Sequence, residues 1–319
     1  MKAFLLLAAA LFILQTAIAQ TSYTWNGSVS SSWTTPGNWT PNGIPGGADD
    51  VKIVTAGNIC ILNASTTIND IDLTSGTLDL NSATLTINGA SALFTSGTVQ
   101  NGNVVVSSAN TTRFGTGAVT MNCSVQIAAS TISIRNTTFQ GVVDITKTGS
   151  TYDGSNGNNI FNGSSTITNA GSGALVLAST GGDQFYNSAI FNNTGSSYLH
   201  IAYNSSNNLF AGVTTFNNVP TANTAIYIGW YSTGVLFNND IVVNATSGSG
   251  VQFCGGNATA SAVLASGQTI SIGVNGFSSG ILSLRHFTQS GSIPLNLSTT
   301  GNSEVRLGPS GNFGGAVTI

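Results

Sequence analysis

Carboxylates are the side chains of this chain that could cleave a substrate, because an acid–base pair or a metal site needs several of them close together. The chain has ten acidic residues: Asp49, Asp50, Asp70, Asp72, Asp79, Asp144, Asp153, Asp183, Asp240 and Glu304. Only Asp49-Asp50 and Asp70/Asp72 are local pairs, and the three residues between 153 and 240 do not share a common spacing. A repeating fold would therefore not stack them. The sequence predicts no catalytic carboxylate cluster.

Histidine and cysteine do not indicate a nucleophile or a metal site either. His200 and His286 are the only histidines, and neither lies beside a nucleophile elbow of the strand–turn–helix kind. Cys60, Cys123 and Cys254 are far apart and odd in number, which fits neither a disulfide framework nor a metal-ligand spacing. We expect small, buried thiols. The sequence predicts no metal and no cofactor.

Aromatic residues form the one candidate binding site. In segments 199–201 and 226–228, alternation sends His200 and Tyr227 outward if the apolar residues point inward, with Gln252 next in the same column. Tyrosine and tryptophan stack on sugar rings and also hydrogen-bond. Such binding should vary little with salt, because no ion pair takes part. The predicted glycan site comprises His200, Tyr227, Trp230 and Tyr231. The alternative is that Trp230 or Tyr231 packs into a corner of the fold.

These segments belong to a repeat of about 25 residues between Phe161 and Gly255. Its three columns are Phe161, Phe185, Phe210 and Leu236; Asn169, Asn193, Asn218 and Asn244; and Leu175, Leu199, Ile226 and Val251. Periods of 20–50 residues are typical of solenoids, propellers and arrays, in which each repeat buries its apolar face on its neighbours. The asparagine column indicates a ladder of stacked side-chain amides at a turn.

Composition indicates strands rather than helices. Charged residues make up 5% of the chain and hydrophobic residues 41%, in short runs that alternate with polar residues, as in 84–87 and 131–134. Strands this short at a 25-residue period favour a right-handed parallel β-helix over residues 53–319. A β-sandwich or a propeller is the alternative, although propeller blades are about 40–50 residues long. The net charge of −3 and the lack of a basic stripe exclude nucleic acid as a partner.

The N-terminus has the pattern of a secretory signal peptide over residues 1–19. Lys2 supplies the positive charge, residues 4–14 are apolar, and Ala17-Ile18-Ala19 is an A-x-A cleavage site. An uncleaved membrane anchor is the alternative, but the apolar run is short for a span of about 20 residues. The sequence therefore predicts a secreted or cell-surface protein with no membrane span after cleavage.

Residues 20–52 are rich in tryptophan. The strings are Trp25-Asn26-Gly27, Ser32-Trp33, Gly37-Asn38-Trp39, Ile44-Pro45 and Asp49-Asp50-Val51. This segment resembles the start of the mature region in large, repeat-rich β-helical surface proteins of Bacteroidetes-type bacteria, which are adhesin-like. The open end of a solenoid needs a cover, and we expect these indoles to form an N-terminal cap. A carbohydrate-binding tryptophan cluster is the alternative.

The resemblance also implies a longer polypeptide. Such surface proteins carry further coils and a C-terminal sorting domain, and the sequence stops at the strand-like 316–319. We therefore expect an N-terminal fragment whose solenoid is truncated at its C-terminus, either monomeric or part of a longer chain.

Taken together, these features predict a secreted or cell-surface, adhesin-like structural β-solenoid without catalytic activity. Its expected partners are extracellular glycans or other cell-surface components. The alternatives are a polysaccharide lyase or glycoside hydrolase of the parallel β-helix type, and a dedicated glycan-binding module.

Overall fold

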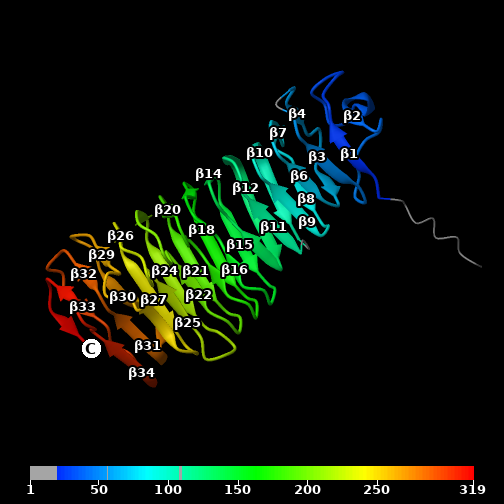
Figure 1. Cartoon of the computed structure of the whole chain (residues 1–319). Helices are drawn as coiled ribbons and strands as arrows, with labels where there is room; N and C mark the ends of the chain where they lie inside the picture. Colours follow the sequence, from blue (N-terminus) through cyan, green and yellow to red (C-terminus); the bar gives the residue numbers. More distant parts are fainter. Residues whose placement is uncertain (1–19, 56, 108–109) are drawn as a thin grey trace, which may run out of the picture.

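The chain winds into a parallel β-solenoid of about 12 turns, which confirms the predicted fold class. This computed structural model describes residues 20–55, 57–107 and 110–319. The turns stack into an elongated body with the N-terminal coils at one end and the C-terminal coils at the other (Figure 1). The signal peptide expected at residues 1–19 lies outside the described residues. Within the described ranges, no helix is long and apolar enough to cross a membrane. The right-handed sense of winding stays a prediction.

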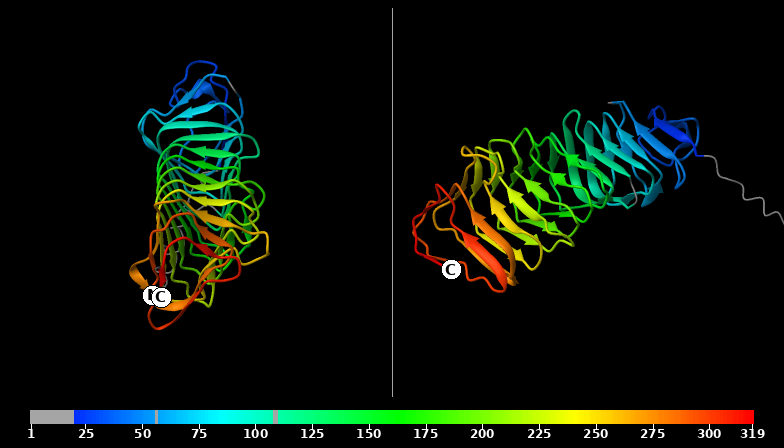
Figure 2. Two further views of the ribbon diagram at one scale, coloured as in Figure 1. Left: turned by 90° about the vertical axis from the view of Figure 1, so that its left-hand side faces the viewer. Right: turned by 60° about the horizontal axis from the view of Figure 1, so that its bottom comes forward.

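Each turn adds a strand to each of three stacked faces (Figure 2). Face 1 contains β4 (Cys60–Ile61), β7 (Thr77–Asp79), β10 (Gly97–Val106), β12 (Val119–Ala129), β14 (Thr137–Phe139), β17 (Ile160–Phe161), β20 (Gln184–Phe185), β23 (Asn208–Phe210), β26 (Val235–Phe237), β29 (Ala262–Leu264), β32 (Phe287–Gln289) and β35 (Asn312–Phe313). The long strands β10 and β12 run on into face 2, where they lie between β8 and β15.

Face 2 contains β5 (Thr66–Ile68), β8 (Thr84–Ile87), β15 (Val143–Lys147), β18 (Ser165–Asn169), β21 (Ala189–Asn193), β24 (Thr214–Asn218), β27 (Ile241–Ala245) and β30 (Ile270–Phe277). Face 3 contains β1 (Ser22–Trp25), β2 (Trp39–Thr40), β3 (Asp50–Ile53), β6 (Ile71–Leu73), β9 (Ser91–Phe94), β11 (Thr111–Phe114), β13 (Thr131–Ser133), β16 (Asp153–Gly154), β19 (Leu175–Val176), β22 (Leu199–Ile201), β25 (Ala225–Ile228), β28 (Gly250–Phe253), β31 (Ser279–Leu284) and β34 (Asn302–Arg306). A further pair, β33 (Leu295–Asn296) and β36 (Val317–Thr318), lies near the C-terminus.

A column of phenylalanine rings on face 1 fills the core. Phe161, Phe185 and Phe210 are in register, with centroids 4.5 and 5.1 Å apart. The fourth ring is Phe237, 4.7 Å from Phe210. The prediction of Leu236 in this position was wrong: Leu236 pairs with Leu209, points outward and is 38% exposed. This coil is longer than its predecessors, and a slip of one residue reverses the face of a strand.

The aliphatic column on face 3 follows the prediction. Leu175, Leu199, Ile226 and Val251 are in register on successive strands, and all four are buried. The column continues with Leu282. Alternate residues of each strand point inward, and stacked coils therefore bury one continuous apolar surface.

The asparagines form two columns on face 2 rather than one. The inner column holds Asn169, Asn193 and Asn218, and its fourth position is Ala245, so the assignment of Asn244 to it was wrong. Asn244 belongs to the outer column, where it continues the series Thr168, Asn192 and Asn217. This coil is longer than the preceding ones, so Asn244 lies one residue away from the position of the inner column.

The outer column is the more regular amide ladder. Asn217 Nδ2 donates to Asn192 Oδ1 at 2.8 Å, and Asn244 Nδ2 donates to Asn217 Oδ1 at 2.8 Å. The inner amides bond mainly to turns: Asn169 Nδ2 donates to the Tyr198 carbonyl and Asn218 Nδ2 to the Thr224 carbonyl. Both amide columns therefore connect coils, since Asn193 Nδ2 also donates to Asn218 Oδ1 at 3.0 Å. The inner column in addition anchors the turns that lead from face 2 to face 3.

The three N-terminal tryptophans pack together in the core. Trp39 lies edge-on to Trp25 and Trp33, with centroid distances of 4.9 and 4.8 Å, and all three are buried. Trp25 lies on β1 and Trp39 on β2, the strands that end face 3, and Trp33 lies in the segment between them; β2 is antiparallel to β1. Burial of all three rings disfavours the alternative of an exposed carbohydrate-binding tryptophan cluster. Their role as a cap stays a prediction.

Side chains replace backbone acceptors between β13 and β16. The N–H of Ile132 donates to Asp153 Oδ2 at 2.8 Å, and the N–H of Ile134 donates to Ser155 Oγ at 2.9 Å. Face 3 is therefore divided into two backbone ladders, one ending at β13 and one beginning at β16. We refer to this junction as the side-chain seam.

A second set of buried polar residues lies where face 3 turns into face 1. Asn159, Asp183 and Asn208 occupy corresponding positions on successive coils, and we refer to them as the corner column. The N–H of Asn159 donates to Asp183 Oδ1 at 3.0 Å, and the N–H of Asp183 donates to Asn208 Oδ1 at 3.1 Å. Each side chain thus accepts the amide of the preceding coil.

Candidate functional site

Face 3 presents one outward column that contains the predicted site. His200 on β22 pairs with Tyr227 on β25, and Tyr227 pairs with Gln252 on β28. The column continues through Ser283 on β31 to Arg306 on β34. Neighbouring strands are about 4.8 Å apart, so these side chains follow the solenoid axis at that interval. The predicted order of His200, Tyr227 and Gln252 is confirmed.

Six aromatic side chains lie on or beside the first two positions of this column, and we refer to them as the aromatic cluster. They are Tyr198, His200, Tyr203, Tyr227, Trp230 and Tyr231. The imidazole of His200 stacks on Tyr227 at 4.8 Å and lies edge-on to Tyr203 at 4.7 Å. Trp230 lies edge-on to Tyr227 at 4.4 Å. The structure therefore brings together all four residues that the sequence proposed as a glycan site.

Tyr198 was missed as a member of this cluster. It precedes β22 and its ring lies 4.9 Å from His200. The signal was present in the sequence, because Tyr198 lies two residues before His200 and period-2 alternation points both to the same side. Tyr198 and Tyr231 are the most exposed rings of the cluster, at 36% each.

Trp230 is half-buried and packs against the backbone of the next coil. A Cβ atom at Gly255 would lie 2.3 Å from Cζ3 of Trp230, and one at Gly256 would lie 2.5 Å from its Cδ1. Two adjacent glycines therefore leave the space that the indole occupies. The packing alternative is correct for part of the ring, and the remainder stays accessible.

His200 is the buried centre of the cluster, 8% exposed. Burial lowers the pKa of its imidazole to about 4, so the ring is neutral at neutral pH. Its Nδ1 is buried and has no hydrogen-bond partner among the described residues. Unpaired buried polar atoms are rare and call for an explanation such as a functional role. Here the atom belongs to a ring that contacts Tyr198, Tyr203 and Tyr227.

The carboxylates serve structural purposes at several positions. Asp50 accepts bonds from the side chains of Gln20 and Asn69. Asp153 belongs to the side-chain seam and lies 3.8 Å from Nζ of the buried Lys147, while Asp183 belongs to the corner column. Over the described residues, no three His, Cys, Asp or Glu side chains are grouped to hold a metal ion. Cys60, Cys123 and Cys254 are buried and unpaired, as expected.

Comparison with known proteins adds no relative. No family model, no curated protein and no solved structure matches the chain.

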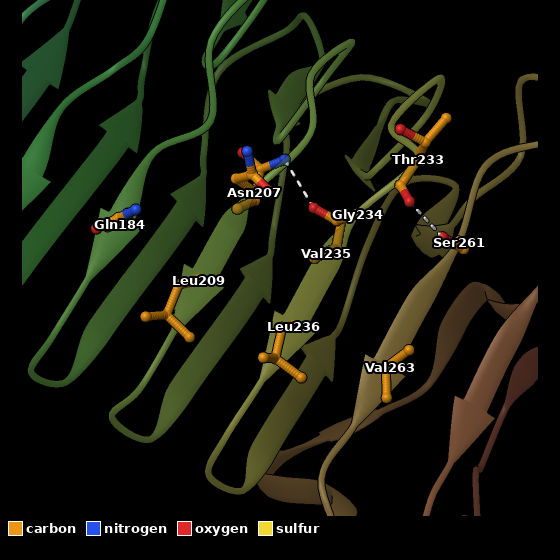
Figure 3. A pocket seen from close by; sticks show the side chains of 10 residues that line it. Gln184, Asn207, Leu209, Thr233, Gly234, Val235, Leu236, Ser261 and Val263 are labelled. Carbon is orange, nitrogen blue, oxygen red and sulfur yellow. Dashed lines mark hydrogen bonds between the residues drawn. The ribbon is translucent and has the colours of Figure 1, made fainter.

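Face 1 carries a groove that the sequence did not single out. Its floor is the outward column Leu209, Leu236 and Val263, and its volume is about 460 Å³ (Figure 3). Thr233 and Ser261 lie at its polar rim, where the hydroxyl of Ser261 donates to the Thr233 carbonyl at 2.8 Å (Figure 3). The three apolar side chains come from successive coils. The groove contains neither a charged residue nor a ring, so face 3 remains the better candidate for recognising a sugar.

Proposed function

We propose that the protein is a secreted or cell-surface, adhesin-like β-solenoid without catalytic activity that binds extracellular glycans at the aromatic cluster. The observation that carries this proposal is the convergence of six aromatic side chains from two adjacent coils on the outside of face 3. Outward aromatic residues are not needed for the core, which phenylalanine and aliphatic columns already fill.

The chemistry of the aromatic cluster suits a sugar. A pyranose has apolar C–H faces and polar edges, and tyrosine and tryptophan have apolar rings with polar tips. The exposed rings of Tyr198 and Tyr231 lie at the cluster's periphery, and the partly covered rings of Tyr227 and Trp230 lie between them. Because these rings lie on or close to the adjacent strands β22 and β25 and pack against one another, their arrangement is pre-organised and costs little entropy on binding.

The alternative function is a polysaccharide lyase or hydrolase. Such an enzyme needs an acid–base pair or a metal site beside the bound sugar. The aromatic cluster itself contains no carboxylate, and its histidine is held neutral by burial. These observations support a binding role over a catalytic one. Incubating the purified chain with acidic and neutral polysaccharides tests this directly: release of reducing ends or unsaturated products would overturn the non-enzymatic proposal.

Replacing both Tyr227 and Trp230 by alanine should lower glycan affinity at least about tenfold, because aromatic contacts of this kind dominate such interfaces. The measurement is a glycan array followed by titration of the strongest binder. Tyr186→Ala is the matched control, since Tyr186 is an exposed tyrosine on face 1, outside the cluster. An array signal that the double variant retains in full, with the fold intact by circular dichroism, would remove the site.

A further inference from the structure

The aromatic cluster does not end at Trp230 but adjoins a cationic cavity. Gly255, which packs against the indole of Trp230, accepts a hydrogen bond from Nη1 of Arg285 at 3.3 Å. Arg285 in turn lines a cavity of about 240 Å³ on the same face, together with Gln252, Ser283 and Arg306. The rings and the guanidinium groups therefore occupy one continuous strip of face 3.

The strip has the length of a short oligosaccharide. Three steps of register lead from Tyr227 through Gln252 and Ser283 to Arg306. At about 4.8 Å per strand, these steps cover about 14 Å along the solenoid axis. Gln252 and Ser283 lie between the rings and the arginines. The partly exposed amide of Gln252 is suited to sugar hydroxyls, whereas Ser283 is buried.

Of the two arginines that line this cavity, Arg285 is the one without a counter-charge among the described residues. Arg306 is engaged by Glu304, with Nε–Oε1 and Nη2–Oε2 distances of 2.6 and 2.7 Å. Arg285 has no ion pair within the described part of the chain, and its buried Nε has no hydrogen-bond partner there. A guanidinium presents five N–H donors in a planar fork that matches a carboxylate or a sulfate. Within the described residues its one hydrogen bond goes to the Gly255 carbonyl, which leaves most of that capacity unused.

From this arrangement we infer that the glycan bound on face 3 is acidic, with its rings on the aromatic cluster and an anionic group, carboxylate or sulfate, on Arg285. This inference rests on the proposed function and specifies the ligand class. Affinity for an acidic glycan should fall as salt rises, because part of it is charge attraction. Stacking on the rings alone has no such dependence.

The test uses the full chain and three probes: hexagalacturonate, its fully methyl-esterified form, and a sulfated heparin hexasaccharide. The esterified probe removes the charge and leaves the sugar chain unchanged. We expect hexagalacturonate or the heparin fragment to bind at least about tenfold more tightly than the ester, since charge-assisted hydrogen bonds are the stronger ones. Whichever anionic probe is preferred identifies the anion as carboxylate or sulfate. That preference should shrink at high salt.

Substitutions then assign the preference to the cavity. Arg285→Gln should abolish the preference for the anionic probe, because it removes the cation that binds the anionic group. Glu304→Gln should raise anionic affinity, because it removes a competing carboxylate and frees Arg306. Arg113→Gln is the control, since Arg113 is an exposed arginine on β11 and outside this cavity.

The outcomes separate this inference from the proposed function. Equal affinity of the anionic and esterified probes, or a preference that survives Arg285→Gln, would overturn the acidic specificity. If those probes still lost affinity in the variant lacking Tyr227 and Trp230, the proposed glycan site would stand. Absence of binding by all three probes would overturn both.

Discussion

Replacing Phe185 by alanine is expected to destabilise the protein by about 3–5 kcal/mol, the usual cost of removing a buried phenylalanine. Phe185 lies between Phe161 and Phe210 in the face 1 column, and Phe191 lies edge-on to it at 5.3 Å. Removing the ring would leave a cavity bounded by three other rings. Each coil is held mainly by its two neighbours, so the loss weakens two coil interfaces at once.

Urea or thermal unfolding of the native chain and the variant measures this effect. Leu209→Ala is the matched control, because Leu209 lies on the neighbouring strand of the same face and points outward. We expect that control to change the free energy of unfolding by less than about 1 kcal/mol. Equal losses from the two substitutions would contradict the inward and outward assignment of the columns.

The second large effect concerns pH and Asp183. Burial raises the pKa of this carboxyl from 3.8 to about 7, against the opposing effect of the hydrogen bonds from Asn159. Between these two values the folded state keeps the proton that the unfolded state releases. Stability is therefore lost as the pH rises from about 4 to 7, by up to about 4 kcal/mol, since one unit of pKa corresponds to about 1.4 kcal/mol.

Asp183→Asn should remove this loss. The asparagine keeps an Oδ1 acceptor for the Asn159 amide and carries no charge. The same column already contains two uncharged asparagines, Asn159 and Asn208. We expect the variant to be more stable than the native chain at pH 8 and closer to it at pH 4.

The comparison of variant with native chain is necessary because His200 works in the opposite direction. Its pKa is lowered to about 4, so its contribution is lost as the pH falls from about 6.5. That effect is common to both proteins and cancels in the difference. Unfolding of both proteins at pH 4 and pH 8 measures the difference in stability. Asp144→Asn is the control, because Asp144 is an outward carboxylate of β15. A variant less stable than the native chain at pH 8 would contradict the assignment.

The fold was predictable because the solenoid repeats its core residues. The column through Leu199, Ile226 and Val251 could be read from spacing alone, since each coil buries the same apolar position. The same spacing failed at Leu236 and Asn244. There the turns differ in length from coil to coil. Because successive side chains of a strand point to opposite faces, an assignment that is wrong by one residue places the side chain on the wrong face.

The aromatic half of the site was predictable for the same reason, and the cationic half was not. Arg285 and Arg306 looked scattered in the sequence, because the coil between Gln252 and Ser283 contains the long strand β30 and departs from the 25-residue period. Only the register of β28, β31 and β34 places Arg306 in the column of Tyr227. Arg285 joins them through its contact with Gly255, which no periodicity could indicate.

The side-chain seam has a consequence for how the solenoid unfolds. In a stack of repeats, the free energy is approximately a sum of coil terms and nearest-neighbour couplings, and the weakest coupling sets where cooperativity breaks. Rungs supplied by Asp153 and Ser155 require ordered side chains, whereas the strands paired on either side of the seam are joined by backbone ladders. The coils before β13 and those after β16 should therefore behave as two coupled foldons, which amide hydrogen exchange would resolve as two levels of protection. Frayed N-terminal coils would then leave the aromatic cluster of face 3 intact.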